Sequence, residues 1–270
     1  MFRFLFSCFI AVASPVLADG FATDWSAGTK SRARLLAGGE ISPGHYRLAI
    51  DVELAPNTIT YWRNPGEAGL PPQFSFEGSD NVATAELRFP APKKLLEAGL
   101  AANGYKAHVT FPLEIVARDA RLPVRLNYQF DYAVCEKLCI PAKASGLLQL
   151  PHEAGSYSDV IGAAEAKIPL RHPLGMGGEL AIVAITPEGG DKNLLFRVEI
   201  RAPEAAELFL EVTEPLFATL EPLTARQFRL RFDPLPSGVD LAAQKVRLTL
   251  VGENHAVETE IRLDGMPLTP

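Results

Sequence analysis

The feature that most constrains the fold is a series of short segments in which apolar and polar side chains alternate. In residues 126–134, LNYQFDYAV, apolar residues occupy the even positions and polar or small residues the odd ones. A period of two is typical of a β-strand with one buried face. Comparable segments are 46–54, 59–62, 74–76, 82–89, 109–116, 147–150, 180–185, 194–200, 208–212, 228–232, 246–251 and 257–263. Turn-forming residues such as Pro56-Asn57 and Asn64-Pro65-Gly66 separate the segments. The chain is therefore predicted to be all-β.

The strand segments fall into two groups. Those within residues 19–150 have the number and spacing of an immunoglobulin-like β-sandwich, and those within 179–270 predict a second β-sandwich. Residues 151–178 read as a short, partly helical linker. In it, Ser156–Lys167 has near-helical apolar spacing with Ser156 as the N-cap, and prolines and glycines follow.

The N-terminus has the pattern of a signal peptide. Arg3 precedes an apolar run that ends in small residues, so residues 1–18 are expected to be cleaved near Ala18/Asp19. The run is shorter than a membrane span, and no comparable run follows. The mature chain is therefore expected to be exported without inserting into a membrane.

The charge balance argues against polyanionic partners. The chain has 26 basic and 32 acidic residues, a formal net charge of -6, and no basic cluster. Neither nucleic acid nor an anionic membrane surface is therefore an expected partner. The second half has no cysteine and no cluster of histidine with acidic residues, so it offers no chemistry of its own.

The chemistry is expected at Cys135 and Cys139, the two cysteines that remain once Cys8 leaves with the signal peptide. In an exported protein such a pair is expected to be able to form a disulfide. An extended chain would separate their Cα atoms by about 13 Å, whereas a disulfide needs less than about 7 Å. The chain must turn between them, which places the pair at a hairpin tip before Pro141. Alternation puts Cys135 on the polar strand face.

Spacing alone leaves three roles open for this pair: an inert disulfide, a redox-active disulfide, or a metal site. A bridge that closes so small a loop gains only about 2 kcal/mol from chain entropy, which makes it a poor staple. A metal site is the least favoured, because His108 and His152 are isolated in the sequence. No metal or other cofactor is predicted.

Residues 132–142, YAVCEKLCIPA, resemble the cysteine-bearing strand and turn of the N-terminal region of DsbD/ScsB-type thiol:disulfide interchange proteins. Further matching segments are TYWRNPGEAGLPP (60–72), FPAP (89–92), NGY (103–105) and FPL (111–113). The resemblance covers residues 25–150. For the second half, only the order of domains agrees with ScsB-like proteins.

This resemblance implies a periplasmic immunoglobulin-like domain that takes electrons from a thioredoxin-like or membrane-embedded cysteine pair and reduces disulfides in client proteins. The chain would be a component of a protein-disulfide reductase. Cys139 would form the bond with the partner, and Cys135 would resolve it. The chain stops at Pro270 before any transmembrane or thioredoxin-like part. The expected partners are therefore thioredoxin-like periplasmic proteins and a separate membrane thiol reductase.

By position in the resemblance, a loop at residues 97–105 shields the pair. The residues expected to line the site are Tyr61, Trp62, Glu97, Tyr105, Tyr132, Glu136 and Pro141. Tyr61 and Trp62 have a competing interpretation as sandwich core, because aromatic residues in strands usually pack inward.

The sequence departs from the DsbD pattern in two ways. The cysteine spacing is narrower, and residues 96–102 hold no aromatic residue that could cover the pair. Two other functions stay open. One is a non-catalytic binding or adaptor sandwich with a structural disulfide, and the other is a copper-tolerance protein.

Overall fold

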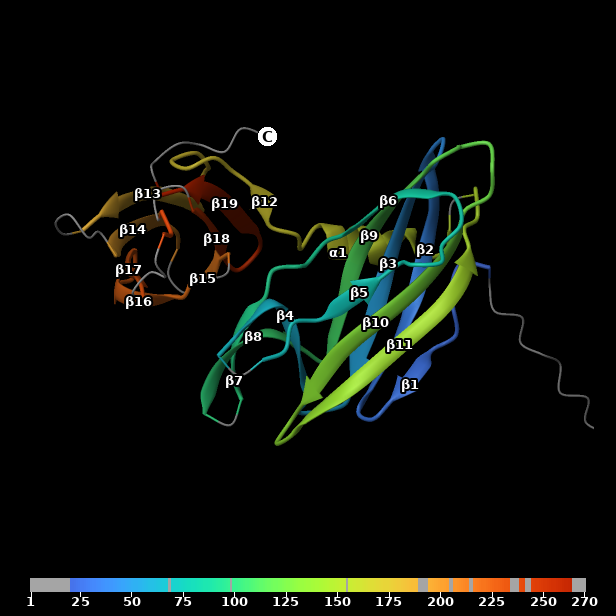
Figure 1. Cartoon of the computed structure of the whole chain (residues 1–270), viewed down its shortest axis with the longest axis horizontal. Helices are drawn as coiled ribbons and strands as arrows, with labels where there is room; N and C mark the ends of the chain where they lie inside the picture. Colours follow the sequence, from blue (N-terminus) through green and yellow to red (C-terminus); the bar gives the residue numbers. More distant parts are fainter. Residues whose placement is uncertain are drawn as a thin grey trace, which may run out of the picture.

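The computed structural model describes residues 20–67, 69–97, 99–153, 155–188, 194–203, 206–213, 216–233, 238–240 and 244–263. The predicted signal peptide and its cleavage site near Ala18/Asp19 lie outside the described residues. Two bodies built of β-strands are arranged side by side along the longest axis of the molecule (Figure 1).

The first body is a sandwich of two sheets. The five-stranded sheet has the order β1-β2-β3-β9-β6, and the six-stranded sheet has the order β11-β10-β4-β8-β7 with β5 also paired to β10. The strands are β1 (Ser26–Gly28), β2 (Ser31–Ser42), β3 (His45–Leu54), β4 (Ile59–Gly66), β5 (Gln73–Ser75), β6 (Val82–Leu87), β7 (Lys93–Glu97), β8 (Leu100–Lys106), β9 (His108–Ala117), β10 (Arg125–Cys135) and β11 (Cys139–Gln149).

The alternating residues of these strands form the core between the sheets. Leu126, Tyr128 and Phe130 of β10 are buried, and Phe111 of β9 meets the Phe130 ring at 6.1 Å. The even positions of 126–134 therefore face inward, as the period of two predicts.

The second body is a sandwich of two four-stranded sheets, ordered β12-β19-β18-β15 and β13-β14-β17-β16. The strands are β12 (Leu170–Arg171), β13 (Ala181–Pro187), β14 (Leu195–Arg201), β15 (Glu207–Val212), β16 (Ala218–Thr224), β17 (Gln227–Phe232), β18 (Lys245–Val251) and β19 (Ala256–Arg262). Val198, Leu230, Val246 and Leu250 lie in its core. The predicted all-β fold of two immunoglobulin-like sandwiches is confirmed.

Six strands were not predicted as segments: β1, β2, β7, β8, β12 and β16. The sequence of β7, KKLLE, does not alternate, and that of β8, LAANGYK, is rich in small residues. Strand β11 is also longer than the expected 147–150 and begins at Cys139. Both β7 and β11 lie at edges of their sheet, where pairing on one side orders a strand without a strong apolar pattern.

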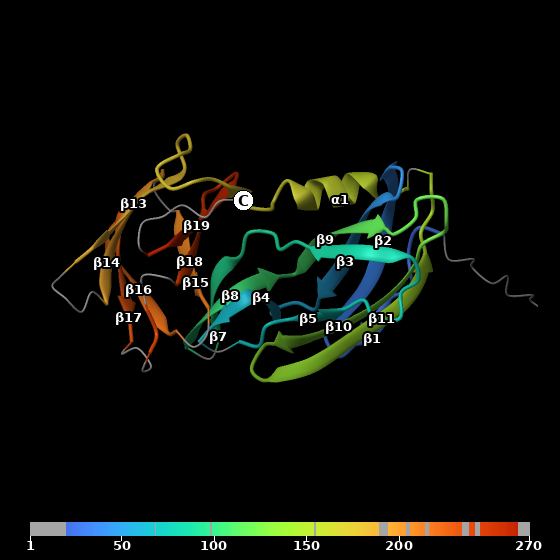
Figure 2. The same ribbon diagram turned by 45° about the horizontal axis from the view of Figure 1, so that its top comes forward.

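The helix α1 (Ser158–Glu165) lies within the predicted linker but packs against the first sandwich. Ile161 is buried, and Arg47 of β3 forms an ion pair with Glu165. Figure 2 shows α1 beside β2, β3 and β9. The predicted N-cap, Ser156, is wrong: the N-cap is Tyr157, and no side chain caps the helix. The hydroxyl of Ser158, the first helical residue, lies within hydrogen-bonding distance of the Gly38 and Gly155 carbonyls.

In the part of the chain that the structure describes, no helix is both long and apolar enough to cross a membrane.

Candidate functional site

The cysteine pair closes the tip of the β10–β11 hairpin. The antiparallel register runs from Arg125 opposite Gln149 down to Cys135 opposite Cys139. The two cysteines form a disulfide, and their Cα atoms are 4.1 Å apart. The exposed turn 136–138 completes the tip. This is the turn that the spacing of the two cysteines requires.

The two cysteines differ in exposure. Cys139 is exposed, whereas Cys135 is only 1% exposed. Cys135 lies on the same face as Ala133, as the alternation predicts, but the expectation that this face is polar is wrong at Cys135. Side chains of β4, β7 and β8 bury that end of the face. Cys135 packs in a small apolar cluster with Ile59, Tyr61, Leu95, Ala102 and Ala133.

Tyr61 brings a hydroxyl group to both sulfur atoms. Its Oη lies 2.9 Å from Cys135 Sγ and 3.2 Å from Cys139 Sγ. The same hydroxyl donates a hydrogen bond to Glu97 Oε2. Burial raises the pKa of Tyr61 well above its ordinary value, and the hydrogen bond and negative charge of Glu97 raise it further. Tyr61 is therefore a neutral phenol that can donate a hydrogen bond at any physiological pH.

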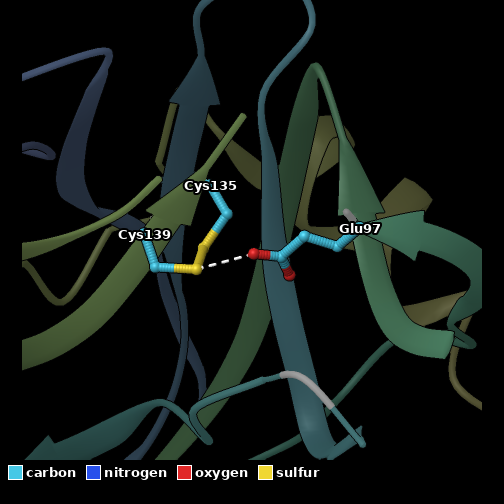
Figure 3. Close-up of side chains that lie close together, drawn as sticks. All are labelled: Glu97, Cys135 and Cys139. Carbon is cyan, nitrogen blue, oxygen red and sulfur yellow. Dashed lines mark hydrogen bonds between the residues drawn. A yellow bond between two sulfur atoms is a disulfide. The ribbon is translucent and has the colours of Figure 1, made fainter. Parts of the chain in front are cut away.

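Glu97 approaches the exposed sulfur from the β7–β8 hairpin. Its Oε1 lies 2.6 Å from Cys139 Sγ (Figure 3). A disulfide sulfur carries no proton, so this contact becomes a hydrogen bond only after reduction, with the Cys139 thiol as donor. The carboxylate also occupies space through which a thiolate must approach Cys139. The aromatic cover missing from residues 96–102 is thus replaced by a carboxylate on β7 and a phenol on β4.

These groups also form a candidate metal site. One ligand atom each from Glu97, Cys135 and Cys139 can be chosen such that all lie within 4.8 Å of one another. In the reduced protein they are two thiolates and one carboxylate, a donor set suited to Zn²⁺, and the thiolates alone suit Cu⁺.

Two aromatic residues predicted to line the site, Trp62 and Tyr105, make their ring and hydroxyl contacts elsewhere. Trp62 follows Tyr61 on β4 and points to the opposite face, where its ring meets Phe209 of the second sandwich at 5.7 Å. The Tyr105 hydroxyl donates to the Pro90 carbonyl at 2.8 Å. Trp62 and Tyr105 therefore belong to the apolar core of the first sandwich rather than to the surroundings of the sulfur atoms.

The remaining predicted residues belong to the hairpin itself and contact residues other than the cysteines. Tyr132 is buried, and its hydroxyl lies 2.8 Å from Ser31 Oγ. Glu136, in the turn, forms an ion pair with Lys30. Pro141 is exposed on β11 opposite Ala133.

The sequence interpretation missed three exposed leucines that adjoin site residues. Leu96 and Leu138 directly precede Glu97 and Cys139, and Leu100 pairs with Glu97 in the β7–β8 hairpin. The sequence held a signal for Leu96 and Leu138, each of which adjoins a charged residue in a segment without strand alternation.

The comparisons with known proteins agree with this geometry. The family model of the N-terminal part of the thiol:disulfide interchange protein DsbD matches residues 32–150. Residues 32–150 form a DsbD-type N-terminal domain. The match contains both cysteines, Tyr61 and Glu97, so the DsbD-type domain carries the whole candidate site and is a thiol:disulfide interchange module.

A solved structure extends the likeness beyond the DsbD-type domain. The N-terminal periplasmic domain of ScsB from Proteus mirabilis is 21% identical, with a TM-score of 0.71, and the match covers 91% of this chain and 99% of that one. At this identity the likeness shows a shared fold, and it includes the second sandwich.

Two further structures are more distant. The GAE domain of yeast GGA1 has 12% identity and a TM-score of 0.27, with 47% of this chain and 96% of that one covered. A marsupial T cell receptor has 10% identity and a TM-score of 0.18, with 88% and 99% covered. Scores this low support no conclusion. No curated protein matches the chain.

Proposed function

We propose that this chain is a periplasmic electron-transfer module that passes reducing equivalents through Cys135 and Cys139 to client or partner proteins, as a component of a protein-disulfide reductase. The observation that carries the proposal is the asymmetry of the disulfide. Its Cys139 sulfur is exposed at a hairpin tip, and its Cys135 sulfur is buried directly beneath. The periplasmic location is supported by the description of the ScsB domain and by the predicted signal peptide.

In the reduced protein, the Cys139 thiolate attacks one sulfur of a client disulfide, and the other client sulfur leaves as a thiolate. The resulting mixed disulfide is resolved when the Cys135 thiolate attacks Cys139 Sγ and releases the second client sulfur. Two electrons pass to the client, and the Cys135–Cys139 disulfide forms. The client sulfurs take up the two protons that the cysteine thiols lose.

Regeneration reverses these steps with a dithiol donor. A donor thiolate attacks Cys139 Sγ, and Cys135 leaves as a thiolate in a largely apolar cluster. Burial disfavours that charge. The neutral Tyr61 hydroxyl, 2.9 Å away, lowers its cost when its one proton turns from Glu97 to the Cys135 sulfur. The donors we propose are thioredoxin-like periplasmic proteins and a separate membrane thiol reductase.

The proposal is tested by trapping. In Cys135→Ala the resolving thiol is gone, so we expect the variant to accumulate a covalent adduct with a thioredoxin-like partner on non-reducing gels. We expect no adduct from Cys139→Ala. Both variants should stay folded by circular dichroism, because the bridge adds only about 2 kcal/mol. If neither variant forms an adduct, or if loss of the bridge unfolds the domain, the disulfide is a structural staple of an adaptor protein.

The Glu97, Cys135 and Cys139 cluster favours one second candidate, a metal site of the reduced protein related to copper tolerance. The test is a titration of the fully reduced chain with Cu⁺ or Zn²⁺ against a chromophoric chelator. Stoichiometric binding that is lost in both Cys135→Ala and Cys139→Ala supports this function. If the reduced protein does not take either metal from the chelator, this function is excluded.

A further inference from the structure

One strand of the second sandwich docks onto the strands that cover the disulfide. In β15, Leu208 and Leu210 pack into the second sandwich core, so Glu207, Phe209 and Glu211 point out of it. These three residues meet β4 and β7 of the DsbD-type domain.

The polar contacts on β4 are made by the residues that follow Tyr61 and Trp62. Arg63 binds the Glu211 carboxylate with two parallel hydrogen bonds of 2.8 and 2.7 Å, and it also pairs with Glu258 of β19. The Asn64 amide donates to the Leu210 carbonyl at 2.6 Å. Bidentate pairing fixes the direction of the guanidinium as well as its position.

The apolar contact is the Phe209 side chain, which is only 2% exposed. Its ring meets Trp62 of β4 edge-on at 5.7 Å and thereby joins the core of the first sandwich. Lys94 of β7 places its ammonium group 5.6 Å from the centre of the same ring, and the Lys94 amide donates to Glu207 Oε2 at 3.2 Å. Phe209 therefore contacts both β4 and β7.

These are the two strands that reach the disulfide. Tyr61 directly precedes Trp62 on β4, and Glu97 lies on β7 with Lys94. Among the described strands, β4 pairs with β10 through Cys135 and Ile59 alone. The unit β4–β8–β7 thus meets the cysteine hairpin at the Cys135–Ile59 pair, through the Thr60–Ala133 hydrogen bond and through Tyr61 and Glu97, and its other side meets β15. Figure 2 shows these strands at the end of the first sandwich that is nearest the second.

We infer that the second sandwich is a positioning element for the redox site: β15 holds β4 and β7 so that Glu97, which the Tyr61 hydroxyl also binds, stays over Cys139 and slows attack on it. Its biological meaning rests on the proposed function. The responsible residues are Phe209, Glu211 and Glu207, which touch neither sulfur and act through Trp62, Arg63 and Lys94.

The test measures how fast dithiothreitol reduces the disulfide in the full chain. Phe209→Ala removes the side chain that contacts both β4 and β7. We expect reduction about two- to thirtyfold faster, the range of energetic coupling between sites joined by packed contacts. Glu211→Gln keeps the shape but removes the charge, and it should accelerate reduction in the same direction. It serves as the test if Phe209→Ala does not fold.

The matched control is Arg229→Gln, which removes an ion pair with Glu188 on the other sheet of the second sandwich. It should leave the rate unchanged. In a Glu97→Ala background the cover is already incomplete, so Phe209→Ala should add much less than it does alone. If Phe209→Ala accelerates reduction equally with and without Glu97, the substitution loosens the whole protein and the inference is wrong. The inference is also wrong if neither Phe209→Ala nor Glu211→Gln changes the rate. Exchange of the unaltered chain with a thioredoxin-like protein tests the proposed function separately.

Discussion

Glu97 is the residue whose charge most directly affects the exposed sulfur. Its carboxylate oxygen lies 2.6 Å from Cys139 Sγ, so in the reduced protein a negative carboxylate disfavours a negative thiolate. A negative group beside the exposed cysteine therefore makes the reduced pair less reactive.

We therefore expect Glu97→Gln to speed alkylation of Cys139 in the reduced protein, because the carboxylate charge that disfavours the thiolate is gone. The measurement is the rate of iodoacetamide alkylation of reduced protein against pH. Glu136→Gln is the control, because Glu136 pairs with Lys30, and it should shift the profile less. An unchanged profile in Glu97→Gln would show that Glu97 only fills space.

His108 and Asp51 form a second charged pair, remote from the site. His108 Nε2 lies 2.6 Å from Asp51 Oδ1. The hydrogen bond to Asp51 raises the pKa of His108 despite burial. Burial raises the pKa of Asp51, but hydrogen bonds from His108 and Thr110 outweigh it, and the net pKa is lowered.

The stabilisation from His108 is complete below its ordinary pKa of 6.5 and is lost as the pH rises through the higher folded value. The Asp51 contribution is present above its ordinary pKa of 3.8 and is lost as the pH falls through its lower folded value. His108→Gln should therefore lower the unfolding free energy more at about pH 5.5 than at about pH 9. Because the His108 side chain is half exposed, the difference should stay near 1 kcal/mol or below.

Urea denaturation at the two pH values measures this, with His255→Gln as the control, an exposed histidine of the second sandwich. A loss of stability in His108→Gln that is equal at both pH values would exclude the ion pair as its source.

At the scale of elements, pairing with β8 positions β4 and therefore Tyr61, whose hydroxyl contacts both sulfur atoms. Gly104 of β8 lies opposite Tyr61, and a Cβ at Gly104 would lie 2.1 Å from the Thr60 carbonyl oxygen. Backbone atoms cannot move aside as a flexible side chain can, so this strand pair admits only glycine here.

Gly104→Ala should therefore destabilise the protein by about 1–3 kcal/mol and increase hydrogen exchange in β4 and β8. Gly28→Ala in β1 is the matched control, because a Cβ there meets its nearest atom at 3.4 Å, an ordinary contact. Equal stability of the two variants would contradict the close approach of β4 and β8.

At the scale of the whole molecule, the connection between the sandwiches is short. The Lys167 carbonyl accepts a hydrogen bond from Ala91 of the first sandwich, and Leu170 already pairs with Val257 in the second. Pro169, between them, is buried. Much of the predicted 151–178 linker is therefore packed against one sandwich or the other. The domain boundaries 19–150, 151–178 and 179–270 stay predictions.

Limited proteolysis should accordingly cut in the exposed loop 173–179, where Met176 is 62% exposed, and spare the docked helix at 158–165. The two fragments should elute together in size-exclusion chromatography, because the Phe209 and Arg63 contacts survive the cut. A denaturing gel of the eluted peak shows both fragments. Separate elution would show that the docked arrangement is weak.

The sequence by itself determined the features that depend on neighbours along the chain. The period of two in residues 126–134 predicted β10 and its inward face. The spacing of Cys135 and Cys139 required a turn, and the YAVCEKLCIPA segment identified the thiol:disulfide interchange family. Such features are readable because strand alternation and tight turns are local.

Only the tertiary structure decided how the disulfide is covered. Tyr61 and Glu97 are 36 residues apart, Tyr61 and Cys135 are 74 apart, and Arg63 and Glu211 are 148 apart. The burial of Cys135 depends on side chains of β4, β7 and β8 that pack against it, and the docking of β15 depends on Phe209, which belongs to the core of the first sandwich. These contacts are set by which strands become neighbours, and that choice minimises exposed apolar area over the whole molecule rather than within any one segment.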